Sequence, residues 1–370
     1  MDDEARTPSG LDPVHRREPR GRPPWGRRWP ARNPRPEGGS SHDHPRPAYA
    51  ALDLGTNNCR LLVARPAREG FRVIDAFSRI IRLGEGMAAS GRLGEAAIER
   101  AIEALSICRD KMRNRAVTRA RLIATEACRS AANGMEFRAR VQRDVGLDLE
   151  IVDRETEAEL AAIGCTPLMD PAAEGVILFD IGGGSSEIVR LGRSHPADGG
   201  PPVPQIRGWA SLPVGVVSLA ERYGGVKVDH ALYEAMTAEV EALVRRFAAE
   251  HCAGLDLSTM HLLGTSGTVT TIAGLHLRLR RYDRRQVDGC WMIDSQVQCV
   301  LDELRAMSYD ERVASPCIGA ERADLVLAGC AILEAIRRVF PCERLRVADR
   351  GLREGMLVEL MRADDVWARG

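Results

Sequence analysis

One stretch of the sequence places an acid, a run of glycines and two hydroxyls in an order that suits phosphate chemistry. Residues 176–189 begin and end as apolar runs rich in β-branched side chains, which is typical of buried strands. The polar and glycine residues between these runs include Asp180, Gly182, Gly183, Gly184, Ser185, Ser186 and Glu187. Consecutive glycines remove every Cβ from a turn, so backbone N–H groups can close on an anion. An aspartate at the strand end can face a hydrated Mg²⁺ beside that anion. A glycine run alone would be more typical of an ordinary hairpin.

The same arrangement occurs a second time, in residues 49–63. An apolar strand ends in Asp53, and a second apolar strand begins near Arg60. The turn residues between them include Gly55, Thr56 and Asn57. Two strand–acid–glycine–hydroxyl–strand units predict a duplicated α/β architecture with one unit in each half. Two such hairpins, facing each other across a cleft, would hold a phosphate chain from both sides.

A third candidate anion site follows a predicted strand at residues 260–264. The strand-to-helix turn there contains Gly264, Thr265, Ser266, Gly267 and Thr268. The first N–H groups of a helix have no partner within the helix, so they are free to bind an anion.

Two charged stretches allow both a structural and a chemical interpretation. Arg129 and Asn133 are four residues apart in a predicted helix, so we expect one shared face, which contacts either water or a phosphate. Residues 153–159 contain four acids, among them Glu157. Acids in the first turn of a helix usually complement its dipole. A carboxylate at a helix start beside a strand end can also point into a cleft and orient a water molecule.

Composition limits the function classes. The chain has 370 residues, enough for two or three domains, and its formal net charge of +0 with a pI of about 7.1 gives no general electrostatic case for nucleic-acid binding. Its ten cysteines include no C-x-x-C pair, which indicates a reducing cytosol and argues against disulfides or zinc. No apolar run reaches the ~20 residues of a transmembrane helix. The acidic first residues do not resemble a secretory signal.

Periodicity predicts the elements that would position these residues. Residues 1–47 are rich in Pro, Arg and Gly and should be disordered, and residues 192–204 should form a flexible loop. Besides the strands of the two glycine hairpins, strands are expected at residues 71–83, 121–125, 149–152 and 207–213. Helices are expected at 94–115, from an N-cap at Thr125, from about 153, and at 229–251 and 324–340.

The motifs carry a family resemblance. The pair A-L-D-L-G-T-N-N and F-D-I-G-G-G-S-S-E resembles the two phosphate loops of the actin, sugar-kinase and Hsp70 superfamily. The variant D-I-G-G-G-S-S-E, with R-E-T-E-A-E-L upstream and L-L-G-T-S-G-T-V-T-T downstream, resembles the exopolyphosphatase and guanosine pentaphosphate phosphohydrolase family (Ppx/GppA). The resemblance covers about residues 48–362. It implies an α/β fold in which two ribonuclease-H-like (actin-like ATPase, ASKHA) domains, at 48–160 and 161–365, flank a phosphate-binding cleft. Longer relatives have an HD-type C-terminal region, so a short form is expected.

The resemblance also implies roles for individual residues. The family carries a phosphate-contacting arginine at the position of Arg129. Its water-activating base is the second of two adjacent glutamates before an alanine. Glu157 occupies that second place, whereas Thr156 replaces the first glutamate. Asp180, Glu187 and Asp53 would hold Mg²⁺, with Mn²⁺ or a monovalent cation such as K⁺ as further candidates. Backbone N–H groups of the three turns would bind successive phosphates.

The expected function is therefore an exopolyphosphatase that releases orthophosphate from inorganic polyphosphate. It is expected in the cytoplasm, without a membrane or specific nucleic-acid partner. The sequence does not specify the oligomeric state, whereas the resemblance implies a homodimer, since members of the family often dimerise. Conversion of guanosine pentaphosphate to tetraphosphate is the second expectation, since the cleft chemistry is shared. A sugar or acetate kinase of the same superfamily is a third, and the segment R-E-T-E-A argues against it. A polyphosphate- or nucleotide-binding regulator without turnover is a fourth, and Glu157 argues against it.

Overall fold

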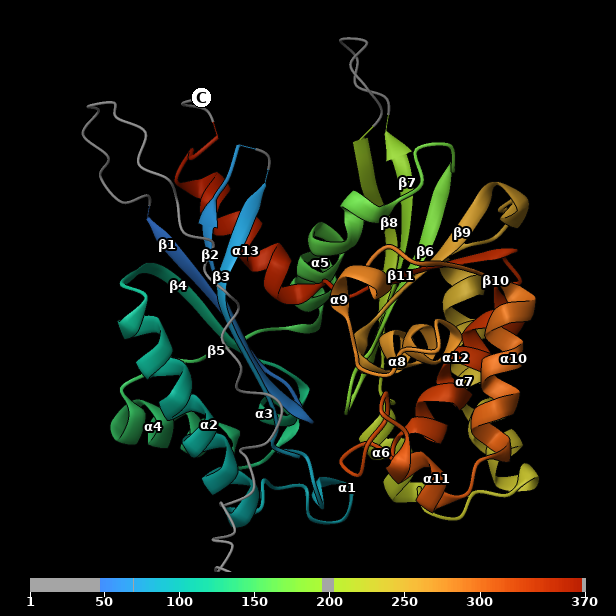
Figure 1. The fold of residues 1–370 in the computed structure, drawn as a ribbon, viewed down its shortest axis with the longest axis horizontal. Helices are drawn as coiled ribbons and strands as arrows, with labels where there is room; N and C mark the ends of the chain where they lie inside the picture. The colour runs from blue at the N-terminus through green and yellow to red at the C-terminus, as the bar shows by residue number, and fades with distance from the viewer. Residues whose placement is uncertain (1–46, 69, 195–202, 368–370) are drawn as a thin grey trace, which may run out of the picture. The chain divides into compact units, whose positions relative to one another are not determined.

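The structure of the protein is a computed structural model that describes residues 47–68, 70–194 and 203–367. The predicted disordered tail lies outside these residues except for Pro47, and so does most of the predicted loop at 192–204. The rest of the chain forms two mixed β-sheets, each with its own helices (Figure 1). The predicted α/β architecture is confirmed.

The first sheet has the strand order β3-β2-β1-β4-β5. Its strands are β1 (Ala48–Leu54), β2 (Asn58–Pro66), β3 (Phe71–Ile80), β4 (Val117–Ala124) and β5 (Glu150–Ile151). The first three strands form an antiparallel meander, and β4 and β5 extend the sheet in parallel from β1. All five predicted strands of this half are confirmed, to within a few residues at their ends.

The second sheet repeats this topology in the order β8-β7-β6-β9-β11, with β10 added at the edge. Its strands are β6 (Gly175–Ile181), β7 (Ser186–Ser194), β8 (Val203–Leu212), β9 (Met260–Thr265), β10 (Trp291–Ile293) and β11 (Arg344–Ala348). Here β6, β7 and β8 form the meander, and β9 and β11 follow β6 in parallel. The duplication predicted from the two glycine hairpins is therefore confirmed.

Helices cover one face of each sheet. In the first half these are α1 (Met87–Ser90), α2 (Glu95–Asn114), α3 (Glu126–Ser130) and α4 (Gly134–Val145). In the second half they are α6 (Val216–Tyr223), α7 (His230–His251), α8 (Ser266–His276), α9 (Arg284–Val287), α10 (Asp294–Ala306), α11 (Tyr309–Ala314) and α12 (Val326–Val339). The predicted helices at 94–115, 229–251 and 324–340 are confirmed. No described helix is both long and apolar enough to cross a membrane.

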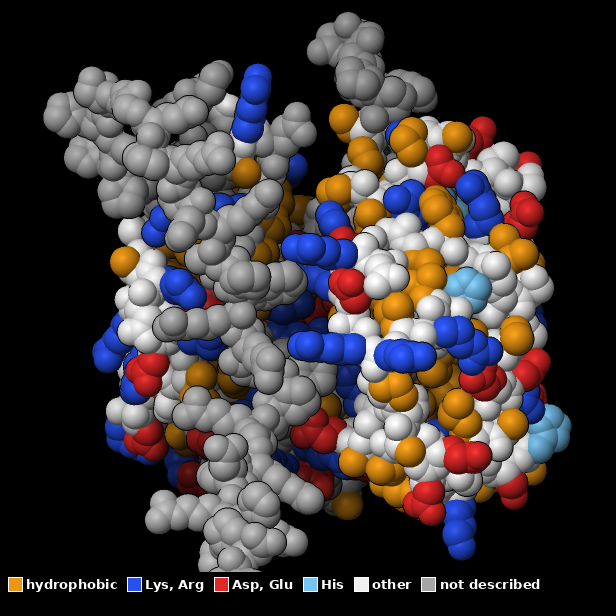
Figure 2. All heavy atoms as spheres, viewed as in Figure 1, with side chains coloured by type: hydrophobic (Ala, Val, Ile, Leu, Met, Phe, Trp, Pro, Cys, Tyr) orange, Lys and Arg blue, Asp and Glu red, His pale blue; other side chains and the backbone are white. Residues whose placement is uncertain are grey.

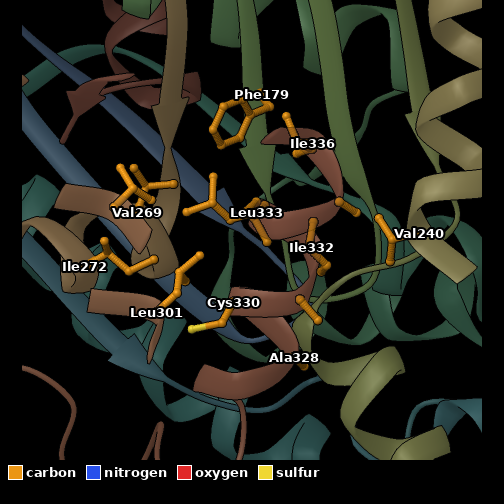
Figure 3. Close-up of a cluster of buried hydrophobic side chains, with 14 of the residues drawn as sticks. Phe179, Val240, Val269, Ile272, Leu301, Ala328, Cys330, Ile332, Leu333 and Ile336 are labelled. Atoms are coloured by element: carbon orange, nitrogen blue, oxygen red, sulfur yellow. The ribbon is translucent and has the colours of Figure 1, made fainter. Parts of the chain in front are cut away.

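The larger core lies between the second sheet and its helices. This core includes Phe179 of β6, Val240 of α7, Leu301 of α10 and Leu333 of α12, all fully or almost fully buried (Figure 3). Alternate residues of β6 point to opposite faces, because successive side chains in a strand alternate. Ile177 and Phe179 thus face this core, whereas Val176 and Leu178 face the other side of the sheet.

Two helices cover the other face of each sheet, and each packs against the sheet of the opposite half of the chain. Helix α5 (Arg154–Cys165) follows the first sheet in the sequence, yet it supplies Ala158, Ala162 and Cys165 to the core on the second sheet. Helix α13 (Leu352–Ala363) follows the second sheet, yet it buries Met356 and other apolar side chains against β1, β2 and β4 of the first. The predicted domain boundary at residue 160 falls inside α5 and stays a prediction.

Helices α5 and α13 pass each other in backbone contact (Figure 1). A Cβ on Gly164 would lie 2.0 Å from the carbonyl oxygen of Gly351, and a Cβ on Gly355 would lie 2.0 Å from that of Leu160. Side chains cannot be accommodated at such distances, so glycine at these two positions sets the separation of the two helices.

The glycine contact generates a stability prediction. We expect Gly355→Ala to lower the free energy of unfolding by about 1–3 kcal/mol, the usual range for overpacking. Helix propensity alone would raise it by about 1 kcal/mol, so a loss isolates the steric effect. Urea denaturation measures the change.

The matched control is Gly94→Ala, because a Cβ on Gly94 meets nothing within 4 Å and its φ of −75° suits alanine. Gly94 occupies an N-cap position, so a change of less than about 1 kcal/mol is expected. If Gly355→Ala were as stable as the wild type, the two helices would tolerate separation and the constraint would not exist.

Candidate active site

The two predicted acids occupy equivalent places in the two sheets. Asp53 lies one residue before the end of β1, opposite Arg60 of β2. Asp180 lies one residue before the end of β6, opposite Glu187 of β7. Residues directly opposite in an antiparallel pair have neighbouring side chains on the same face. Each hairpin therefore presents a pair of charged side chains beside its glycine turn.

These acids are buried close to one another. The pKa of Asp180 is raised to about 6, mainly because burial disfavours the charged form and further because Asp53 carries the same charge. The pKa of Glu187 is raised to about 7 by burial and by the charge of Asp180. Burial also raises the pKa of Asp53. Asp180 thus lies within electrostatic range of both Asp53 and Glu187, while the binding of a metal ion by these three acids stays a prediction.

Hydroxyl groups fix the orientation of Glu187. Its Oε1 accepts hydrogen bonds from the hydroxyls of Ser185 and Ser211, at 2.8 and 2.9 Å. The side chain of Ser185 was predicted only as part of a phosphate-binding turn, and in the structure it orients an acid. A role for its backbone N–H group in binding phosphate stays a prediction.

Glu157 and Arg129 meet although 28 residues separate them in the chain. Asp153 caps α5 by accepting a hydrogen bond from the N–H of Thr156, and Glu157 in the first turn points inward with its side chain only 13% exposed. Glu155, in contrast, is exposed and fits the simple dipole interpretation. Of the four acids in this stretch, only Glu157 faces the other carboxylates.

Arg129 holds Glu157 by one of its two oxygens. Both Nη atoms of Arg129 donate to Oε2 of Glu157 at 3.2 Å, and Nη1 also donates to the carbonyl of Val152 at 2.7 Å. Oε1 of Glu157 makes no hydrogen bond with another described residue. The pKa of Glu157 is raised well above its ordinary value, mainly by burial and then by the charge of Glu187. Contact of Arg129 with phosphate stays a prediction.

The predicted partnership of Arg129 and Asn133 on one helix face is wrong. Helix α3 begins after Thr125, as predicted, but it ends at Ser130, and Asn133 is the N-cap residue of the next helix, α4. Asn133 is buried and exchanges hydrogen bonds with the backbone of Leu93. Asn133 therefore has a structural role. The spacing argument missed this role because it assumed one continuous helix through both residues.

The turns of the two hairpins touch each other. A Cβ on Gly183 would lie 2.9 Å from Cβ of Thr56 and 3.2 Å from the backbone nitrogen of Asn57. A Cβ on Gly184 would lie 2.9 Å from Oγ1 of Thr56. The glycines therefore allow two turns from different halves of the chain to approach closely. That the two hairpins hold a phosphate chain between them stays a prediction.

Parts of both turns are already engaged. The N–H of Gly55 donates to the carbonyl of Asn58 at 2.9 Å and closes the first turn. The carbonyls of Gly182 and Gly183 accept the N–H groups of Val216 and Val217 at the start of α6, at 2.9 and 2.8 Å. These bonds fix the path of the second turn. The N–H of Gly55 is thus less available to phosphate than the sequence suggested.

Of the five residues in the third predicted turn, at 264–268, some lie in the sheet or the core and others lie near the site. Gly264 lies inside β9, paired with Phe179 and Val347, and the side chain of Thr268 packs against Gly329 of α12. Ser266 is different, because its φ of +95° is strained for a residue with a side chain. Gly267 lies beside Arg322, whose Nη1 would be 3.8 Å from a Cβ at that position. Ser266 and Gly267 therefore bring this turn to the site.

Three buried acceptors near the turns have no hydrogen-bond partner among the described residues. They are the side-chain oxygens of Asn57, Asn58 and Ser266. Buried polar atoms are nearly always paired, so each unpaired one calls for an explanation, such as a ligand or an ion. Two of these residues, Asn57 and Ser266, were predicted site residues.

Three arginines near the site were not among the predicted site residues, although a role for Arg353 in supporting the cleft was one of two interpretations of its position. Arg60, Arg322 and Arg353 make no side-chain hydrogen bond or ion pair with another described residue. Burial lowers the pKa of both Arg322 and Arg353, and Arg60 lies near enough to lower each further. All three side chains are partly buried. Withdrawing a guanidinium group from water without a partner is costly, so an anion is expected among these three side chains. The position of Arg60 opposite Asp53 was a signal in the sequence.

The chemistry of the acids fits a hydrated divalent cation. Among the described residues, no group of three or more His, Cys, Asp or Glu side chains is placed so that together they could hold a metal ion. Mg²⁺ usually keeps several waters and takes one or two carboxylates together with substrate phosphates, so it needs no such group. Asp53, Asp180 and Glu187 offer oxygen donors whose mutual repulsion a cation would relieve. The two large surface hollows, of about 320 and 300 Å³, are lined by other residues.

A family model matches most of the chain. The model of the Ppx/GppA phosphatase family covers residues 62–364, from the second strand to the last helix. The match includes Glu157, Asp180 and the turn at Ser266, although it begins after Asp53.

Individual relatives show two different names. The chain is 28% identical over 320 residues to a guanosine-5'-triphosphate,3'-diphosphate pyrophosphatase of Aeromonas salmonicida, covering 86% of this chain but only 60% of that protein. It is also 28% identical over 325 residues to exopolyphosphatase 2 of Mycobacterium tuberculosis, covering 84% and 98%. The crystal structure of the Aquifex aeolicus member of the Ppx/GppA family superposes with a TM-score of 0.69 at 28% identity, covering 86% and 98%.

The buried acids generate a prediction about stability and pH. The pKa of Asp180 in the folded chain, about 6, lies above its ordinary value of 3.8. The protonated carboxyl therefore contributes to the free energy of unfolding fully below pH 3.8, and this contribution is lost as the pH rises through about 6. We expect Asp180→Asn to unfold at higher urea concentration than the wild type at about pH 8 without divalent cations, and the difference to shrink towards about pH 5.

The control is Glu159→Gln, an exposed acid in α5, which should change stability little at either pH. A wild type that is more stable than Asp180→Asn at the higher pH would show that nearby arginines already compensate the buried charge.

Proposed function

Because the chain belongs to the Ppx/GppA phosphatase family, we propose that it is an exopolyphosphatase. It hydrolyses the terminal phosphoanhydride bond of inorganic polyphosphate and releases orthophosphate. The proposal follows the relative whose length the match almost fully covers, which is named exopolyphosphatase 2.

One observation carries the proposal. Carboxylates that repel each other lie beside partly buried guanidinium groups that form no ion pair with another described residue. Asp53 and Asp180 lie within electrostatic range of two of these arginines, since Arg60 and Arg353 offset part of the rise in the pKa of both acids. A ligand that satisfies both sets must carry several negative charges and a cation at once. A metal-bound phosphate chain has this composition.

Glu157 is the candidate base that activates the attacking water. Arg129 binds its Oε2 from both Nη atoms and leaves Oε1 for a water molecule. Burial raises the pKa of the carboxyl, which makes it a stronger proton acceptor than an exposed glutamate. Water oxygen forms the new bond to the terminal phosphorus, the bond to the bridging oxygen breaks, and Glu157 takes the proton of the water.

The remaining residues hold the substrate. Asp53, Asp180 and Glu187 would hold Mg²⁺, which would neutralise charge on the phosphate oxygens. Arg60, Arg322 and Arg353 would bind phosphates through fixed N–H groups, which suit phosphate better than flexible ammonium groups do. Backbone N–H groups of the turns at Thr56, Gly184 and Gly267 would add further donors. Mn²⁺ or K⁺ as additional ions, a homodimer and a cytoplasmic location stay predictions.

A second candidate function is supported by a specific observation. The Aeromonas relative is named for guanosine pentaphosphate chemistry, and its match is as extensive within this chain as the exopolyphosphatase match. A terminal phosphoanhydride is attacked in both substrates, so the same base and acids would serve.

Phosphate release with Mg²⁺ distinguishes these functions. Purified protein is assayed at matched concentrations of long-chain polyphosphate and guanosine pentaphosphate. Preference for polyphosphate supports the first function, and preference for the nucleotide supports the second. Phosphoryl transfer to a sugar or acetate would instead indicate a kinase, and tight binding without release would indicate a regulator.

Removal of the base should separate chemistry from binding. We expect Glu157→Gln to lower kcat by ~10²-fold or more while the affinity for the phosphate chain stays close to that of the wild type. Glutamine keeps the size of the side chain but cannot accept the proton. Steady-state kinetics and equilibrium binding are measured side by side, with Glu159→Gln as the exposed control. Turnover near the wild-type rate would remove Glu157 from the mechanism.

Glu126, which lies beside Glu157, should influence how kcat/KM depends on pH. Glu126 shares Arg129 with Glu157, and although burial would raise the pKa of Glu126, hydrogen bonds from Ser130 and Arg129 lower it overall. Glu126→Gln leaves the charge of Arg129 to Glu157, so the pKa of Glu157 should fall. We expect the acidic limb of the kcat/KM profile to move to lower pH, while Glu159→Gln leaves it in place. An unchanged limb would mean that another group controls it.

A further inference from the structure

A strongly basic segment lies next to the candidate active site. Residues 278–285, R-L-R-R-Y-D-R-R, connect α8 to α9 and contain five arginines and one acid, in a chain whose formal net charge is +0. Figure 2 shows Lys and Arg side chains gathered over the region where Figure 1 draws α8 and α9. Such a concentration of one charge attracts a polyanion.

The segment is fixed to the site at both ends. The carbonyl of Leu279 accepts a hydrogen bond from Sγ of Cys317 at 3.4 Å. The hydroxyl of Tyr282 donates to Asp349 at 2.6 Å, and Arg284 donates to Glu354 at 2.7 Å, next to Arg353. These contacts hold the short stretch between Leu279 and Tyr282 in place, so its side chains extend from an anchored backbone.

The same anchors place this stretch beside the arginines of the cleft. The charge of a deprotonated Tyr282 would act directly on Arg322, which shows that the two side chains are close. Arg322 in turn lies beside Gly267 of the third turn. Arg281 directly precedes Tyr282 in the chain and is exposed, so the segment carries a cation at the surface next to this anchored tyrosine.

The arginines of the segment differ in their partners. Arg278 pairs with Glu303, and Arg284 pairs with Glu354. The acid of the segment, Asp283, is occupied by capping α9. Arg280 and Arg281 are exposed, and neither forms an ion pair with another described residue. Other exposed arginines, such as Arg113 and Arg246, also lack an ion pair with another described residue. What distinguishes Arg280 and Arg281 is that they are adjacent and lie in the segment anchored to Asp349 and Glu354.

We propose that Arg280 and Arg281 form an outer subsite that binds the phosphates of a long inorganic polyphosphate chain where it leaves the cleft. The proposal rests on the proposed function and deepens it, because it specifies a polymeric substrate. Arg60, Arg322 and Arg353 bind the phosphates nearest the scissile bond, and a short substrate ends among them. Only a chain that continues outward reaches the outer subsite.

The test compares one long and one short substrate. In Arg280→Gln/Arg281→Gln we expect the KM for long-chain polyphosphate to rise roughly fivefold at low salt, the scale of two exposed charge contacts. The KM for tripolyphosphate and both kcat values should stay unchanged. The salt dependence of the long-chain KM should become shallower, because fewer counterions are released on binding.

Two matched variants isolate the subsite from net charge. Arg245→Gln/Arg246→Gln removes the same charge from exposed positions of α7 and should leave the long-chain KM unchanged. Arg280→Lys/Arg281→Lys keeps the charge and should restore most of the affinity. An unchanged KM in the first variant, an equal rise for both substrates, or an equal rise in the α7 variant would overturn the subsite.

Direct binding separates failure of the subsite from failure of the proposed function. If the wild type releases phosphate from neither substrate, the proposed function fails, and binding of fluorescently labelled long-chain polyphosphate is then compared in the same variants. Weaker binding by Arg280→Gln/Arg281→Gln alone would still support the subsite. Equal binding by all variants, or no binding by the wild type, would overturn it.

Discussion

The backbone contact between α5 and α13 is the constraint on which the site depends. Gly164 and Gly355 allow the two helices to cross without intervening side chains. Each helix is covalently attached to one sheet and packs against the other, so the crossing joins the two halves of the chain. The first turn of α5 carries Glu157 and the first turn of α13 carries Arg353. The same contact that closes the fold therefore brings a candidate base and a candidate phosphate ligand beside the strand-end acids.

Electrostatics explains why this arrangement indicates binding rather than stability. Burying like charges side by side destabilises a folded chain, and the raised pKa values of Asp180 and Glu187 express that destabilisation. The chain also contains arginines that would neutralise these acids if they formed ion pairs. Arg60 and Arg353 instead make no such pair with another described residue. Strain of this kind persists where the surrounding structure enforces it, and it is relieved when a ligand supplies the missing charges.

The sequence predicted the strands well and some of the contacts poorly, for physical reasons. Apolar runs that end in an acid and glycines predicted β1, β2, β6 and β7, because local pattern determines hairpins. The separation of Arg129 from Asn133 depends on a helix end at Ser130. The pair Asn133 and Gly134 was a turn signal at this point, and its glycine approaches the carbonyl oxygen of Cys128. Arg322 comes to Gly267 only through tertiary packing, and the exchange of α5 and α13 between sheets is likewise a non-local result. Side-chain direction also depends on packing, as Thr268 shows by facing α12.

The unpaired atoms of the site fall into two classes, and their separation constrains the ligand. Asn57, Asn58 and Ser266 leave buried oxygens without donors, whereas Arg60, Arg322 and Arg353 leave donors without acceptors. A simple anion would satisfy the arginines and could accept a hydrogen bond from the hydroxyl of Ser266, but it would repel the acids and the amide oxygens of Asn57 and Asn58. A cation alone would have the opposite fault. Only a ligand that brings positive and negative charge together satisfies both classes, so the ligand-free site should bind metal and phosphate more strongly together than either one alone.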